Sequence, residues 1–382
     1  MKNVLLVRMG EIFLKGDNRM FFIKALVRHI KKAVDGTGAS VELTQGRIFL
    51  RDITDMEDVI RRVTRVFGVH SVSPVVQCEK TMDAICREAV DMMKPLSGTF
   101  KCAARRADKR FPLDSMQINE EVGYQVLTAC PQLTVDVHKP QHELNIEVRE
   151  NAYLYVEKIP AVGGMPVGTN GKAMLLLSGG IDSPVTGYMI AKRGVQLNCI
   201  HYHSFPFTSE QAKQKVIDLA RQLSAYAGPI RMYVVPFTEL QQELYQKCPE
   251  SQLTILMRRY MMRLANRIAH RANCSALITG ESIGQVASQT MDGLCCTNAV
   301  CDMPVFRPLI GFDKTEIMDY AEKIGTYETS ILPYEDCCTI FTPKHPQTKP
   351  RVEQLIESEK LIDGEGLIRR AIEGIEILNI MP

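Results

Sequence analysis

Between residues 172 and 280, short apolar segments alternate with longer amphipathic ones. The segments "KAMLLL", "VQLNCIHYHS", "IRMYVVPF" and "SALITG" are almost continuously apolar, and helical patterns separate them, the last of which is expected as one long helical segment up to Asn273. Strands that are apolar on both faces and joined through helices are typical of a parallel sheet covered on both sides. The pattern predicts an α/β fold with a doubly wound parallel sheet, in which ligands bind at the carboxyl ends of the strands.

The first of these strands runs directly into "SGGIDS", residues 178–183. Glycines let backbone N–H groups approach an anion closely, and the start of the following helix adds a partial positive charge. Pro184 suits the first position of that helix because proline has no N–H to leave unpaired. The segment predicts a phosphate-binding loop, and a tight polar turn without a ligand is the alternative.

Two smaller α+β units precede this domain. Residues 1–57 contain a strand, a helix and a hairpin with its turn at Gln45–Gly46, and a similar pattern restarts and extends over residues 58–162. Residues 163–172 are rich in Gly and Pro without periodicity, which predicts a linker. The catalytic or binding domain is therefore expected at 173–382.

The net charge of +2 hides local basic clusters. Residues 1–50 hold nine Lys or Arg against four Asp or Glu, and "KCAARRADKR" (101–110) holds five bases against one acid. Such clusters can meet a polyanion. Solvated helix faces are the alternative for any one of them.

The apolar residues and the cysteines indicate a cytoplasmic protein. Arg8 and Glu11 interrupt the first apolar run, and no stretch approaches the roughly 18 apolar residues of a membrane span. The twelve cysteines form no C-x-x-C pair, so most are expected to be small buried side chains, and no metal site is predicted. Cys295, Cys296 and Cys301 are expected on a loop with incidental thiols, with metal binding as the weaker alternative.

Several segments resemble one family in the expected order over nearly the whole chain. Together with the 178–183 loop they are "GEIFLKGDNR" (10–19), "RRADKRFP" (105–112), "TGESIGQVASQT" (279–290), "RPLIGFDKTEI" (307–317) and "ILPYEDCCTIFTPKHP" (331–346). They resemble the tRNA 4-thiouridine synthetases, also called thiamine-biosynthesis sulfurtransferases. The resemblance implies a ferredoxin-like domain at 1–57, an RNA-binding THUMP domain at 58–162, and a pyrophosphate-loop ATP pyrophosphatase domain at 173–382.

The resemblance also implies a nucleotide site. Asp182 would serve adenylation by placing the nucleotide or Mg²⁺, which we expect the phosphates to hold. From the residues alone, His201 favours strand-end packing or hydrogen bonding, and Arg258 could equally lie on a solvated helix face. The implied ATP-binding residues are Leu176, Leu177, Ser178, Gly179, Gly180, Asp182, Ser183, His201, Tyr202, Arg258, Gly280 and Gln289.

The activity that the resemblance implies is that of a tRNA uracil 4-sulfurtransferase. Such an enzyme adenylates O4 of uridine 8 and replaces that oxygen with sulfur from a cysteine persulfide, which is a good nucleophile. We expect Cys337, narrowly preferred over Cys338, to carry the sulfur and the other to be buried. The tRNA acceptor end would be bound by Lys101, Arg105, Arg106, Lys109 and Arg110, with Phe111 stacking on a base.

The chain resembles the short members of the family, which have no rhodanese domain. Sulfur is therefore expected directly from a cysteine desulfurase, and a role in thiazole synthesis with a sulfur-carrier protein is left open. A homodimer is compatible with the sequence, which does not set the oligomeric state. Two alternatives remain: another RNA-directed adenylating thiolase or amidotransferase-type enzyme, and a non-catalytic tRNA-binding module regulated by nucleotide.

Overall fold

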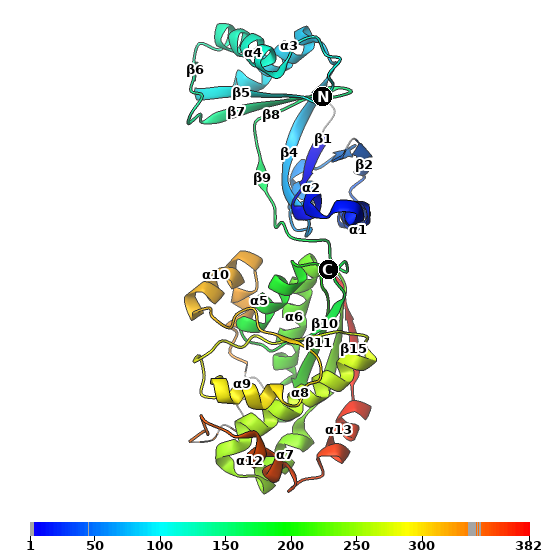
Figure 1. The fold of residues 1–382 in the computed structure, drawn as a ribbon, viewed down its shortest axis with the longest axis vertical. Coiled ribbons are helices and arrows are strands. Elements are labelled where there is room, and N and C mark those ends of the chain that lie inside the picture. Colours follow the sequence, from blue (N-terminus) through cyan, green and yellow to red (C-terminus); the bar gives the residue numbers. More distant parts are fainter. Residues whose placement is uncertain (1–3, 45, 335–340, 342, 344) are drawn as a thin grey trace. The chain divides into compact units, whose positions relative to one another are not determined.

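The computed structural model describes residues 4–44, 46–334, 341, 343 and 345–382. The chain forms two compact units, Met1–Gly164 and Met165–Pro382. Figure 1 labels their helices and strands.

The first unit is built on one sheet, in which β4 (Val69–Cys78) is the shared strand. β4 pairs antiparallel with β1 (Val4–Met9) through its first part and with β8 (Ala152–Tyr155) through its last residues. The order among the described strands is β2-β3-β1-β4-β8-β7-β5-β6, and β9 also pairs with β4. The remaining bounds are β2 Ser40–Thr44, β3 Arg47–Arg51, β5 Gly98–Arg106, β6 Leu133–Val135, β7 His142–Val148 and β9 Ile159–Pro160.

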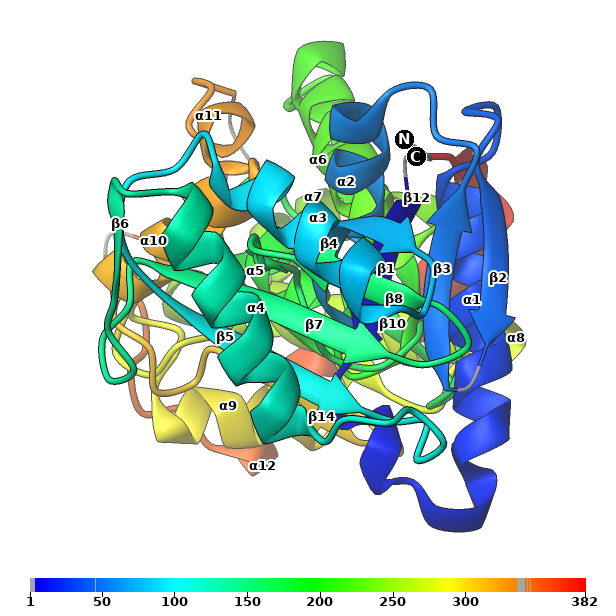
Figure 2. The ribbon, with the colours of Figure 1, turned by 90° about the horizontal axis from the view of Figure 1, so that it is seen from above.

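Four α-helices and two short 3-10 helices of the described residues complete this unit: η1 Glu11–Leu14, η2 Gly16–Asn18, α1 Arg19–Ala33, α2 Met56–Val63, α3 Met82–Met93 and α4 Ser115–Ala129. Thr81 is the N-cap of α3 and accepts a hydrogen bond from the Ala84 backbone N–H. Figure 2 shows α4 crossing the sheet over β5 and β7, where Ile118 packs in one core with Phe100 and Leu144.

The second unit contains the predicted parallel sheet. Its order is β14-β13-β10-β11-β12-β15, and all neighbouring strands are parallel except β15, which runs antiparallel to β12. The bounds are β10 Lys172–Leu176, β11 Gln196–His203, β12 Ile230–Pro236, β13 Leu277–Ile278, β14 Val305–Phe306 and β15 Glu376–Ile380. The predicted fold class is confirmed, and the antiparallel edge strand is an addition that the pattern did not predict.

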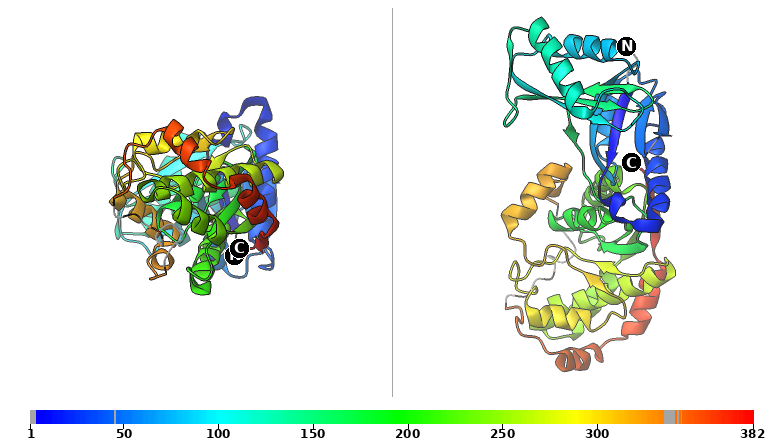
Figure 3. Two further views of the ribbon diagram at one scale, coloured as in Figure 1. Left: turned by 90° about the horizontal axis from the view of Figure 1, so that it is seen from below. Right: turned by 45° about the horizontal axis from the view of Figure 1, so that its top comes forward.

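Helices cover both faces of this sheet. On β10, Met174 belongs to the core formed with α7 and α8, whereas Leu175 lies next to Gly187 of α5 on the opposite face. Figure 3 shows α10 in orange beside α5, and the C-terminal α13 and β15 in red at one edge. The bounds are α5 Asp182–Ala191, α6 Glu210–Ala227, α7 Thr238–Lys247, η3 Glu250–Gln252, α8 Leu253–Arg271, α9 Met291–Asn298, α10 Lys314–Ile324, α11 Tyr327–Ser330, α12 Val352–Glu359 and α13 Gly364–Glu373.

Two local expectations differ from the structure. The helical segment before Asn273 is divided into α7 and α8, because Pro249 cannot continue a helix and its ring restricts Cys248 before it. Helix α5 begins at Asp182, so Pro184 occupies its third position, where a missing N–H still costs nothing. None of the helices in the described ranges is long and apolar enough to cross a membrane.

Candidate nucleotide site

The site lies where the strand order reverses. β10 has β11 on one side and β13 on the other, because the chain proceeds outward to β12 and then returns to the far side of β10. The loops that follow β10 and β13 therefore diverge and leave a crevice at the carboxyl ends of the strands. A cavity of about 360 Å³ opens there, within the usual range for small-molecule sites.

The 178–183 loop is closed by its two serines. The Ser178 backbone N–H donates to Ser183 Oγ at 3.0 Å, and Ser183 Oγ lies 3.2 Å from the Ser178 carbonyl, to which it donates. Gly280, after β13, approaches the start of α5 so closely that a Cβ there would lie 3.0 Å from the Ser183 backbone nitrogen. Glycine at 280 therefore lets the two strand ends meet around the cavity.

Two side chains from the end of β11 complete the inner wall. Nδ1 of the buried His201 lies 3.2 Å from the Leu177 carbonyl, and since that oxygen can only accept, Nδ1 donates. Burial is the main reason that the pKa of His201 is lowered to about 4, so the ring is neutral at pH 7. The Tyr202 hydroxyl donates to the Met261 carbonyl of α8.

Helix α8 supplies the opposite wall. Thr254, Arg258, Met261 and Met262 line the cavity, and their spacing of four, seven and eight residues from the first places them on one helix face. Arg258 is thus not on a solvated face, because it donates to Glu281 and to Ser288 Oγ. This wall combines an apolar surface with one guanidinium group.

Glu281 follows Gly280 and is 4% exposed. Its Oε1 accepts from Arg258 at 2.5 Å, and its Oε2 accepts from Arg307 at 2.7 Å and from Thr279 Oγ1 at 2.8 Å. Burial alone would raise the pKa of Glu281, but the attraction of the two guanidiniums outweighs burial and lowers it. The carboxylate is therefore ionised, and its acceptor positions are engaged.

Asp182 faces a different cation. Its Oδ1 accepts from Lys314 Nζ at 2.8 Å, and Lys314 is the first residue of α10, whose N-terminus is closed by a capping box of Asp313 and Glu316. Asp182 itself is the first residue of α5. The loop, the N-terminus of α5 and one lysine thus provide an environment suited to a phosphate group.

Most of the residues assigned to ATP come together around this one cavity: Leu176, Leu177, Ser178, Asp182, Ser183, His201, Tyr202, Arg258, Gly280 and Gln289. Gly179 and Gly180 belong to the loop but are not among the lining residues. Sequence reasoning gave no role to Thr254, Met261, Met262, Thr279, Glu281, Val286, Ser288 or Lys314. The spacing of Thr254, Met261 and Met262 on α8 and the positions of Thr279 and Glu281 beside Gly280 could have predicted that these residues line the cavity.

Comparison with known proteins decides the family. The profile described as "Thiamine biosynthesis protein (ThiI)" matches residues 168–363, the ThiI ferredoxin-like domain matches 4–73, and the THUMP domain matches 79–157. The chain belongs to the ThiI family. The resemblance inferred from the sequence is thereby confirmed.

Relatives of this ThiI chain match it from end to end. A protein of Alkaliphilus metalliredigens, named "Probable tRNA sulfurtransferase", is 50% identical over 100% of this chain and 99% of its own length. A protein of Lachnospira eligens with the same name is 52% identical over 98% and 99%. A 4-thiouridine synthetase crystallised with RNA and bound ATP is 38% identical, covers 100% of both chains, and superposes with a TM-score of 0.92.

Cys337, which is expected to carry the sulfur, and its alternative Cys338 both lie outside the described residues. The expected loop is wrong for Cys295 and Cys296, which lie on α9. Cys295 is exposed, whereas the Cys296 and Cys301 thiols contact the carbonyls of Pro350 and Thr297. Burial raises the pKa of Cys301 to about 11, so this thiol is protonated at pH 7. Within the described part of the chain, no cluster of three His, Cys, Asp or Glu side chains could hold a metal ion.

The basic segment of the THUMP domain requires one correction. Phe111 is 5% exposed and packs in the core with residues of α3 and α4, so it cannot offer a ring face to a base, and the predicted stacking is wrong. Lys101 pairs with Glu143, and Arg106 donates to the Phe111 carbonyl. Arg105, Lys109 and Arg110 are exposed, although Arg110 also pairs with Asp108.

Proposed function

We propose that this protein is an ATP-dependent tRNA sulfurtransferase that converts uridine 8 of tRNA to 4-thiouridine. The observation that carries the proposal is the single cavity at the strand-order reversal, where the pyrophosphate loop, Asp182 and Arg258 meet. The relatives of the same length are named tRNA sulfurtransferases, and the related synthetase of known structure binds both ATP and RNA.

The residues of the cavity suit adenylation. Adenosine would lie between the apolar strand ends at Leu176 and Leu177 and the methionines of α8, with the phosphates toward the 178–183 loop and Lys314. Uridine O4 attacks the α-phosphorus, pyrophosphate leaves, and O4 becomes part of a good leaving group. The donors of the loop and Lys314 are placed to stabilise the negative charge that develops on the phosphates.

The pocket offers one carboxylate to Mg²⁺. Glu281 is engaged by two guanidiniums and a hydroxyl, whereas Asp182 faces the phosphate region and is bound by one lysine. These residues fit a magnesium ion held chiefly by phosphate oxygens and waters, with Asp182 beside it. Bound there, Mg²⁺ would neutralise phosphate charge.

The sulfur step completes the proposed reaction. The terminal sulfur of a persulfide on Cys337, supplied by a cysteine desulfurase, attacks C4 of the activated uridine, and AMP leaves with the former O4. A thiol then attacks Cys337 Sγ, which breaks the S–S bond, releases 4-thiouridine and leaves that thiol in a disulfide with Cys337. Cys338 is the alternative carrier.

Arg105, Lys109 and Arg110 of the THUMP domain are proposed to contact tRNA phosphates at the acceptor end. We also propose that the protein delivers sulfur to a carrier protein of the thiazole pathway. Its proposed location is the cytoplasm, where tRNA and ATP are present.

The deciding experiment combines the protein with unmodified tRNA, Mg-ATP, a cysteine desulfurase and cysteine. Mass analysis of the digested nucleosides should show one uridine with sulfur in place of oxygen, together with released AMP and pyrophosphate. The thiolated uridine and the released AMP and pyrophosphate should all disappear in Asp182→Ala. AMP without thiolation would leave adenylation standing and reject the desulfurase as donor, and tRNA binding with neither product would favour a non-catalytic binding module.

A further inference from the structure

The wall of the cavity beside Gly280 contains a closed ion-pair network. The two oxygens of Glu281 accept hydrogen bonds from Arg258 on one side and from Arg307 and Thr279 on the other. Arg258 and Glu281 both line the cavity, whereas Arg307 does not. Glu281 therefore sets where the Arg258 guanidinium stands.

Arg258 also binds a loop that borders the cavity. Its second terminal nitrogen donates to Ser288 Oγ at 2.9 Å. Ser288 belongs to the loop 282–290, which is closed on itself where the Ser282 N–H donates to Gln289 Oε1 at 3.1 Å. The network thus joins the end of β13 to α8 and to a loop whose Val286, Ser288 and Gln289 line the cavity.

We propose that Glu281 is a positioning residue that holds Arg258 in the orientation required for nucleotide binding. This inference rests on the proposed function, because it assumes that the nucleotide occupies this cavity. An arginine side chain has many rotamers, and fixing it before the ligand arrives removes an ordering cost from binding. Glu281 acts through Arg258 rather than on the nucleotide.

A second physical effect has the opposite sign. A carboxylate near a triphosphate repels it, so loss of the Glu281 charge alone would strengthen ATP binding. If Glu281 positions Arg258, loss of the Glu281 charge should instead weaken ATP binding. The direction of the change in affinity therefore separates the two roles of this carboxylate.

Glu281→Gln tests the positioning role because an amide has one acceptor oxygen and one donor nitrogen. Arg307 and Thr279 both donate to the Oε2 position, so the amide oxygen is expected to point toward them. The amide NH₂ then faces the NH₂ group of Arg258, and two donors cannot bond. The substitution should therefore release Arg258 while it preserves the shape of the side chain.

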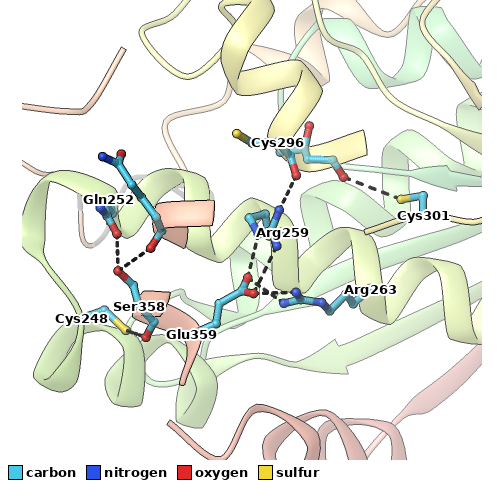
Figure 4. Close-up of polar contacts among 10 residues, drawn as sticks. Cys248, Gln252, Arg259, Arg263, Cys296, Cys301, Ser358 and Glu359 are labelled. Atoms are coloured by element: carbon cyan, nitrogen blue, oxygen red, sulfur yellow. Dashed lines mark hydrogen bonds and ion pairs between the residues drawn. The ribbon is translucent and has the colours of Figure 1, made fainter. Parts of the chain in front are cut away.

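The chain offers a matched control on the same helix. The neighbouring Arg259 pairs with Glu359 of α12, and Arg263 donates to both oxygens of the same carboxylate (Figure 4). None of these three residues lines the nucleotide cavity. Glu359→Gln makes the same chemical change in a network that also joins one carboxylate to two guanidiniums.

The experiment measures the ATP dissociation constant by calorimetry for five proteins: wild type, Glu281→Gln, Arg258→Met, the double variant of these two, and Glu359→Gln. Thermal unfolding is recorded in parallel. We expect Glu281→Gln to bind ATP about tenfold more weakly and Arg258→Met about 10- to 100-fold more weakly. The double variant should be no weaker than Arg258→Met, since Glu281 acts through that arginine, and Glu359→Gln should bind as wild type does.

Three outcomes would overturn the inference. Equal or tighter ATP binding by Glu281→Gln would show that charge, not positioning, dominates. Effects that add in the double variant would show that Glu281 acts independently of Arg258. A wild-type protein without ATP binding would reject the proposed function itself. If Glu281→Gln does not fold, Glu281→Asp replaces it in the same cycle and is judged by the same coupling.

Discussion

Two adjacent arginines of α8 make similar ion pairs in different surroundings. Arg258 pairs with Glu281 at the wall of the nucleotide cavity, whereas Arg259 is 1% exposed and pairs with Glu359 inside the protein. Each carboxylate is shared by two guanidiniums, and each has a lowered pKa even though burial opposes its ionisation. The two networks contain the same kinds of charged group, but only the network of Arg258 borders the nucleotide cavity.

The surroundings decide what each network does. Three nitrogens of Arg259 are used inside the protein: Nε and one terminal nitrogen bind Glu359, and the other terminal nitrogen donates to the Cys296 carbonyl at 2.7 Å. This links α8 to α9 and α12 (Figure 4). Arg258 has the same anchorage on one side, but it also borders the cavity. A buried charge cluster of this kind secures the fold, whereas one at a cavity wall can hold a group ready for a ligand.

The largest expected effect is on stability, from Glu359→Ala. This change leaves Arg259 buried without its partner, and breaking a buried ion pair in this way costs about 3–5 kcal/mol. The melting temperature should fall by roughly 10 °C for a unit of this size. Calorimetric unfolding measures the shift, and the ATP affinity of the folded protein should not change. A fall of only a degree or two would contradict a structural role for this network.

The next effect comes from a pair of neighbouring substitutions. Arg258→Met should weaken ATP binding by about 10- to 100-fold, the range for a hydrogen bond to a charged group, and should lower the melting temperature less than Arg259→Met does. Arg259→Met should leave ATP affinity unchanged. Titration and thermal unfolding of both variants check the contrast. If the two affinities fell equally, the distinction between the networks would be lost.

A smaller effect concerns stabilisation by the ligand. At an ATP concentration of one hundred times the wild-type dissociation constant, binding should stabilise the folded wild type and Glu359→Gln by about 2.7 kcal/mol. A tenfold loss of affinity in Glu281→Gln reduces this to about half. Thermal shifts with and without ATP measure it. An unchanged shift in Glu281→Gln would argue against its positioning role.

The smallest effect is a pH dependence. The folded-state pKa of Glu359 lies below its usual 4.5, so its stabilising contribution is complete above about pH 4.5 and is lost as the pH falls through the lowered value. The difference in unfolding free energy between wild type and Glu359→Gln should therefore narrow between pH 7 and pH 3.5. Urea unfolding at both values tests this, and an equal difference at both would exclude a contribution from the ionised carboxylate.

The sequence predicted the parallel sheet and the loop after its first strand because both depend on local patterns. Apolar runs specify strands buried on two faces, and "SGGIDS" specifies a loop that approaches an anion. The carboxyl ends of the strands were expected to form the ligand site, and residues after β10 and β13, together with two at the end of β11, line the cavity. The division of the long helical segment at Pro249 was also visible in the sequence but was missed.

Other features depend on which surfaces meet in space. "MRRYMMRLANR" contains four arginines, and only the packing of α8 between the sheet, α9 and α12 turns Arg258 to the cavity and Arg259 inward. Phe111 follows a basic loop in sequence, yet the core beneath α4 buries its ring. Lys314 reaches Asp182 from 132 residues away because α10 lies against α5.

The sequence by itself therefore determined the fold class, the family and the position of the phosphate loop, since these follow from short patterns along the chain. Tertiary structure decided which charged side chains are partners. Glu281 and Glu359 are far apart in sequence but accept hydrogen bonds from adjacent arginines. A buried charge needs an opposite charge near it, and the packing of distant segments decides which residue supplies that charge. A short stretch of sequence therefore does not show which residues will pair.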